Sequence, residues 1–107
     1  MYFSYVSALR LRQLFNESQY PELIRKKRLK REVVRSRRLK ASDRQKKSLP
    51  RGTKSEIIIY HDPANKELYV KVHRYVKFYG ILGASGKPDP KAILLDGIMY
   101  LLEGPET

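Results

Sequence analysis

One segment of this chain is too positively charged to be buried. Residues 25–54 contain fifteen Lys and Arg side chains against two acidic ones, Glu32 and Asp43, a net charge of +13 in a chain whose total is +12. Unpaired charged side chains almost never enter a protein core because their desolvation costs too much free energy. The whole positive excess lies in one central segment of thirty residues, which is the usual electrostatic footprint of a polyanion binder.

Composition limits the rest of the interpretation. The chain has 107 residues and no cysteine, so we expect one domain without disulfides or thiolate metal sites. Two histidines are few for a metal site, and no apolar run approaches the roughly 20 residues that span a bilayer. We therefore predict no cofactor, no metal, no membrane partner and no small-molecule substrate, in a cytoplasmic or nucleoid-associated protein.

The first half of the chain is predicted to be helical. Residues 1–20 are apolar with several good helix formers, and Pro21 suits the first turn of a second helix that would run to about Lys47. Within residues 25–47, ten like-charged pairs at helical spacing oppose five favourable ones, which disfavours the isolated helix by about 1–2.5 kcal/mol. We expect a basic helical arm that becomes fully ordered on a polyanion.

The second half is predicted to form strands. Residues 56–60 (EIIIY) form a short apolar run, residues 68–79 alternate in polarity, and residues 93–102 place two apolar runs around Asp96-Gly97, a preferred hairpin turn. The predicted fold class is α+β: an N-terminal helical segment and a long basic helix, followed by a small four-stranded, mostly antiparallel meander. The predicted organisation is a helical segment over 1–47 with its basic arm at 25–47, a linker at 48–55, and a small β domain at 56–107 that packs with the N-terminal segment as one domain.

The alternating strand at 68–79 presents a second candidate surface. Leu68, Val70, Val72, Val76 and Phe78 should point one way, with Arg74 as the exception. The opposite face would alternate aromatic or histidine side chains with lysines, a pattern that suits stacking on bases and contact with phosphates. That face comprises Tyr69, Lys71, His73, Tyr75, Lys77 and Tyr79. The competing interpretation is that tyrosines are simply good strand residues.

A glycine-rich stretch at Gly80–Lys91, GILGASGKPDPK, suggests a phosphate-binding loop but does not fit one. A Walker loop needs Gly five positions before Gly86, where Ile81 stands, and Ser or Thr after Lys87, where Pro88 stands. We therefore predict a turn-rich connection, in which glycine amides or Lys87 could still meet a backbone phosphate.

These observations predict a nucleic-acid-binding protein. The basic arm would lie on the phosphate backbone, most simply of RNA within a larger, ribosome-like assembly with protein subunits, or of DNA in a phage or mobile-element accessory protein. Contacts between the basic arm and phosphates would position the protein on the nucleic acid but would give no base preference. The predicted contact residues are Arg25, Lys26, Lys27, Arg28, Lys30, Arg31, Arg35, Arg37, Arg38, Lys40, Arg44, Lys46, Lys47, Tyr69, Lys71, His73, Tyr75 and Lys77.

Two alternatives stay open. Helices followed by a meander are loosely similar to small ribosome-dependent ribonuclease toxins, although no motif of that family matches. In such an enzyme His73, with Lys71 and Tyr75, would act as the acid–base group on a ribose. We assign no catalytic residue and consider an enzyme less favoured. The other alternative is an interaction module that binds an acidic protein. His61 beside Asp62 is interpreted as part of a turn and is given no role in catalysis.

Overall fold

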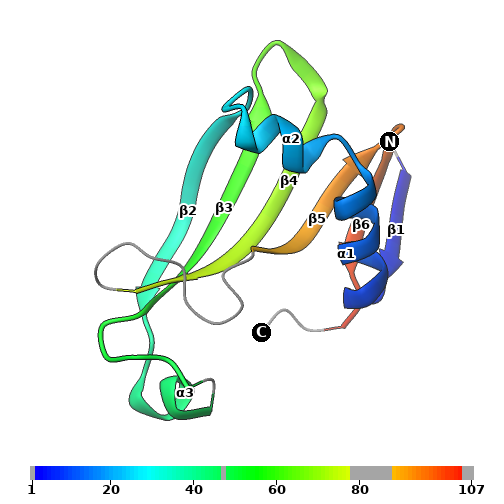
Figure 1. Ribbon diagram of the computed structural model, residues 1–107. Helices are drawn as coiled ribbons and strands as arrows, with labels where there is room; N and C mark the ends of the chain where they lie inside the picture. Colours follow the sequence, from blue (N-terminus) through cyan, green and yellow to red (C-terminus); the bar gives the residue numbers. More distant parts are fainter. Residues whose placement is uncertain (1, 47, 78–87, 105–107) are drawn as a thin grey trace.

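The computed structural model describes residues 2–46, 48–77 and 88–104. A mixed sheet carries two helices on one face, and a third helix lies apart from that helical layer (Figure 1). In chain order the elements are β1 (Tyr2–Val6), α1 (Ala8–Glu17), α2 (Tyr20–Arg25), β2 (Lys30–Arg38), α3 (Ala41–Lys46), β3 (Lys54–Asp62), β4 (Asn65–Val76), β5 (Asp89–Leu95) and β6 (Ile98–Leu102).

The six strands are ordered β1-β6-β5-β4-β3-β2 across the sheet. β1 runs parallel to β6, with Tyr2 opposite Ile98 and Val6 opposite Leu102, whereas every other neighbouring pair is antiparallel. The predicted fold class is therefore wrong in two respects. The sheet has six strands instead of four, and there is no long basic helix among the described residues.

The basic segment is an edge strand where a helix was predicted. β2 pairs with β3 along nearly its whole length, with a bulge between Val33 and Arg35. Two physical reasons favour the strand. The like-charged pairs that crowd a helix surface are separated in an extended chain, and the β-branched Val33 and Val34 suit a strand. Pairing with β3 then outweighs helix propensity, and among the described residues beyond β2 only Ala41–Lys46 is helical.

The N-terminal segment is also partly extended. β1 occupies residues 2–6, and α1 begins after Ser7, whose hydroxyl accepts a hydrogen bond from the backbone N–H of Arg10 at 3.1 Å. This is the N-cap arrangement that satisfies one free amide of the first helical turn. The expected single short helix is thus a strand followed by a capped helix.

The four strands predicted from the second half of the chain are present. β3, β4, β5 and β6 are consecutive antiparallel neighbours, and β5 and β6 meet in a tight turn at Asp96-Gly97. The φ angles of +49° at Asp96 and +78° at Gly97 are those of a type I′ turn, as the Asp-Gly pair predicted. Most of the connection predicted at Gly80–Lys91 lies outside the described residues, as do Phe78 and Tyr79, and its last three residues, Asp89 to Lys91, belong to β5 instead of a turn.

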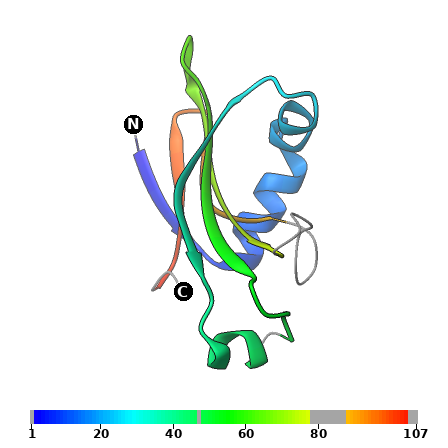
Figure 2. The same cartoon turned by 90° about the vertical axis from the view of Figure 1, so that its left-hand side faces the viewer.

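The core lies between the sheet and the two N-terminal helices, which cover the same face (Figure 2). From α1, Leu11 and Phe15 are buried against strand residues of the central sheet, including Val70 and Val72, both fully buried. The predicted inward direction of Val70 and Val72 is thereby confirmed. The opposite face of the sheet, here called the open face, is covered by no helix of the described part.

Tyr20, the first residue of α2, is fully buried and fastens this helix to the sheet. Its hydroxyl donates a hydrogen bond to the backbone carbonyl of Leu94 in β5 and accepts one from the backbone N–H of Tyr69 in β4, at 3.0 Å. Val70, which follows Tyr69, lies opposite Ile93, which precedes Leu94, and this is the last register pair at that end of β4 and β5. The Tyr20 hydroxyl therefore stands in for a direct backbone hydrogen bond between the N–H of Tyr69 and the carbonyl of Leu94, where the pairing of β4 and β5 ends. Burial raises the pKa of Tyr20, so the hydroxyl keeps the proton that it donates.

We predict that Tyr20→Phe lowers the free energy of unfolding by about 1–3 kcal/mol, because Leu94 and Tyr69 would each keep a backbone group without a partner. Urea unfolding measures this change. Tyr60→Phe is the matched control, since the partly buried Tyr60 packs against the same core and its hydroxyl has no hydrogen bond in the described structure. Equal losses in the two variants would show that Tyr20 contributes only its ring.

Candidate nucleic-acid interface

The basic side chains gather at one edge of the sheet and on a hairpin that extends from it. All nine residues of β2 are exposed, and no strand formed by the described residues lies beyond β2 in the sheet. The far ends of β2 and β3 run past the helical layer and carry α3 at their tip (Figures 1 and 2). We call this surface the cationic edge. It comprises Arg31, Arg35, Arg37, Arg38, Lys40, Arg44, Lys46, Arg51 and Lys54.

Local contacts fold the tip of the hairpin. The backbone N–H of Leu39 donates to the carbonyl of Thr53 at 3.0 Å and closes the two strands, while the Thr53 hydroxyl donates to the carbonyl of Pro50 at 2.7 Å. Thr53 is fully buried and Leu49 nearly so. Gly52 takes a φ of +88°, a conformation that glycine adopts without strain. The segment expected to be a linker is thus a compact turn leading into β3.

Near the start of the basic segment, three of the predicted contact residues pair with acidic side chains of the described structure. Glu22 is within ion-pair distance of Arg25 and Lys26 in α2, and a hydrogen bond from Arg25 lowers the pKa of the Glu22 carboxyl. Lys30 lies 3.5 Å from Glu32. Lys27 and Arg28 follow α2 and form no ion pair with a described residue. Glu22 and Glu32 offset part of the charge at the start of the basic segment, and the larger group of cations without an ion pair among the described residues lies further along, on the cationic edge.

No carboxylate of the described residues forms an ion pair with a side chain of the cationic edge. The strand register directs these side chains to both faces. Arg35 and Arg37 lie opposite Ile57 and Ser55 and share the open face with them. Arg31 and Arg38, also on β2, project to the other face. An anion could therefore approach β2 from either side.

Next to Arg35 and Arg37, the open face continues onto β4. The register aligns Arg37, Ser55 and Tyr75 across three strands, and in the same way Arg35, Ile57 and His73. The predicted set Tyr69, Lys71, His73, Tyr75 does share one face, opposite Val70 and Val72, but it is not an exposed ridge. Tyr69, Lys71 and Tyr75 are half-buried and His73 is only 7% exposed; Lys77 lies just beyond β4.

The surroundings of His73 are those of a packed side chain. A ring nitrogen of His73 is 2.7 Å from the Ser55 hydroxyl, and the ring meets Tyr75 edge to face with 4.7 Å between centroids. A general acid or base must reach the proton that it transfers, and this ring is held within the sheet surface. The buried position of His73 therefore gives no support to the ribonuclease alternative, in which this histidine would be the acid–base group.

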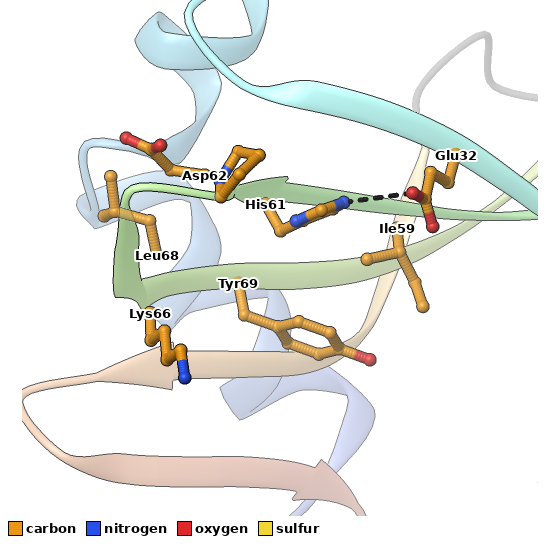
Figure 3. Close-up of a pocket in the computed structure, with 8 residues that line it drawn as sticks. Glu32, Ile59, His61, Asp62, Lys66, Leu68 and Tyr69 are labelled. Carbon is orange, nitrogen blue, oxygen red and sulfur yellow. Dashed lines mark ion pairs between the residues drawn. The ribbon is translucent and has the colours of Figure 1, made fainter.

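The structure also contains a pocket that the sequence did not indicate (Figure 3). His61, expected in a turn, lies in β3, and its Nε2 is 3.4 Å from a carboxylate oxygen of Glu32, without a hydrogen bond. Lys66 and Tyr69 line the same pocket. Histidine, carboxylate, lysine and tyrosine are groups of acid–base chemistry, but Glu32 is already engaged by Lys30 as well as His61.

Sequence reasoning missed two members of the cationic edge, Arg51 and Lys54, because both fell in the expected linker. Their charge was visible in the sequence, but the position of Arg51 beside Arg44 of α3 depends on the turn at Gly52, and Lys54 reaches the edge through its pairing opposite Arg38. Lys47, also predicted as a contact, lies outside the described residues. Among those residues, no group of three or more acidic, histidine or cysteine side chains could hold a metal ion. No helix in the described part is long and apolar enough to cross a membrane.

Comparison of the chain with protein-family models, curated proteins and solved structures finds no match. The functional argument therefore depends on the residues and their geometry alone.

We predict that His73→Ala lowers the free energy of unfolding by about 1–3 kcal/mol, because it removes a buried ring and leaves the Ser55 hydroxyl without that partner. Chemical unfolding measures the change. Ser36→Ala, in the exposed strand β2, should change it by less than about 0.5 kcal/mol. An RNA-cleaving activity that disappears in a stably folded His73→Ala protein would contradict the packed role.

Proposed function

We propose that this protein binds nucleic acid, with the phosphate backbone on the cationic edge. The observation that carries the proposal is the location of the charge. The excess of +13 in residues 25–54 lies largely on one exposed strand and its hairpin, with no acidic partner among the described residues for any cation of the edge. A surface of this kind lowers its electrostatic free energy when phosphates replace water and counterions.

A purely structural explanation accounts for only part of this charge. Edge strands often carry lysine or other charges that prevent pairing with further strands. A few charges are enough for that purpose, and β1, the other edge strand, has none in YFSYV. The contrast between the two edges favours a role for β2 and its hairpin beyond protection of the sheet.

Single-stranded RNA is the form that we favour. The row Arg37, Ser55 and Tyr75 places an arginine and an aromatic residue on one face, with their backbones two strand spacings or about 10 Å apart. Cations that follow a backbone beside aromatic rings that accept bases are the usual elements of single-strand recognition. Unpaired RNA segments expose bases for such stacking.

The proposal predicts a steep dependence of affinity on salt. With about five to eight phosphates contacted on a single strand, the slope of log affinity against log salt concentration should be about −3.5 to −5.5. Fluorescence anisotropy with a labelled single-stranded RNA measures it, with single-stranded and duplex DNA as competitors. A flat slope, or a complex with an acidic protein that survives nuclease treatment and excludes RNA, would contradict the proposal.

Paired variants test the location of the contacts. Arg35→Gln with Arg37→Gln should reduce the slope by about 1.4, because each lost phosphate contact removes about 0.7. The matched control is Arg10→Gln with Lys66→Gln, which removes the same charge from exposed positions outside the cationic edge. Equal effects of the two pairs would mean that only net charge matters.

A further inference from the structure

Three arginines of the cationic edge surround one hollow at the tip of the hairpin. The hollow has a volume of about 370 Å³ and lies where the end of β2, α3 and the turn before β3 meet. Arg38 comes from the end of β2, Arg44 from α3 and Arg51 from the turn, so the fold brings together charges that are separate in the sequence. The remaining lining residues are Leu39 and Gly52.

These arginines have no carboxylate partner in the described part of the chain. Asp43 precedes Arg44 in α3 but does not line the hollow, and no ion pair joins it to any of the three. Like charges that line one concavity raise its potential and cost free energy while no anion is present. Guanidinium groups match phosphate oxygens with paired N–H donors, which a single ammonium cannot do.

The hollow has a backbone frame of its own. The Leu39–Thr53 hydrogen bond joins its two sides, and the carbonyl of Arg44 accepts a hydrogen bond from the N–H of Leu49 at 2.9 Å. Gly52 forms part of the wall without a side chain to fill the space. The arginine stems therefore start from fixed positions, which reduces the ordering cost of binding an anion.

We propose that this hollow binds one phosphate group of a polynucleotide. Its volume leaves room for part of the sugar attached to the phosphate, and Leu39 offers that sugar an apolar wall. The site deepens the proposed function and rests on it for the identity of the ligand. The phosphate is either a monoester at a strand end or an internal diester, and the two sources share the same chemistry.

Inorganic phosphate is the first probe, titrated into the isotope-labelled full chain and followed by NMR of backbone amides and arginine side chains. We expect saturable shifts at Arg38, Arg44 and Arg51, with millimolar affinity. Arg44→Gln should weaken this binding at least tenfold, and Arg44→Lys should recover only part of it, since a lysine keeps the charge but loses the paired donors.

Arg10→Gln is the matched control, because it removes the same charge from an exposed position of α1 outside the cationic edge, and it should change phosphate affinity by less than twofold. Circular dichroism checks that all variants fold. Absence of saturable shifts in the wild type, or equal losses from Arg44→Gln and Arg10→Gln, would overturn the proposed site. Full recovery of phosphate affinity in Arg44→Lys would show that positive charge alone, without paired guanidinium donors, accounts for the binding, and would also overturn the proposed site.

Single-stranded RNA with a 5′-phosphate, compared with the same RNA with a 5′-hydroxyl, separates the two sources of phosphate. A preference for the 5′-phosphate that disappears in Arg44→Gln supports a strand-end site, whereas equal weakening of both RNAs supports an internal phosphate. RNA binding with a steep salt slope but no special effect of Arg44 would refute the hollow and leave the proposed function standing. Phosphate binding at the hollow without RNA binding would refute the proposed function alone.

Discussion

The hydroxyl group of Tyr20 is the contact on which the arrangement of this fold depends most. It joins three elements at one point, because α2 supplies the phenol, β4 the backbone N–H of Tyr69 and β5 the carbonyl of Leu94. A buried polar group is tolerated only when its hydrogen bonds are made, and here one hydroxyl satisfies two backbone groups of the sheet. The contact fixes where the helical layer lies on the sheet.

The position of α2 in turn determines where the charge lies. The chain leaves α2 through a turn in which Lys27 has a φ of +55°, and it then pairs with β3 on the side away from β4. The most basic strand is thus the last strand of the sheet, and β1, without charge, is the opposite edge. Separation of the two edges keeps the cations away from the apolar core and leaves them open to a polyanion.

Sequence reasoning succeeded where the signal was local. Asp96-Gly97 determined a hairpin because few residue pairs adopt two consecutive positive φ angles, and the alternation around Val70 and Val72 identified the buried face of β4. It failed where pairing is non-local. The parallel contact of Tyr2 with Ile98 has no signature in either segment, and the like charges of residues 25–47 opposed a helix without indicating the strand partner.

For the candidate site, too, local features could be predicted from the sequence and non-local ones could not. Charge density led to the hypothesis of a polyanionic partner, which stays a prediction, whereas the positions of individual side chains required the fold. His73 was expected on an exposed ridge, but its pairing opposite Ile57 and its contact with Ser55 bury it. Conversely, Arg51 acquires its place beside Arg38 and Arg44 only through the turn at Gly52. A convergence of residues from three elements cannot be recognised in a linear pattern.

The central claim, that nucleic acid lies along the cationic edge, is tested most directly by mapping amide chemical shifts while an unlabelled single-stranded RNA is added to the labelled protein. The account predicts that the shifts concentrate in β2, α3 and the start of β3, and extend across the open face to Tyr75. Shifts centred on β1 and β6, or a spectrum unchanged at saturating RNA in low salt, would contradict it.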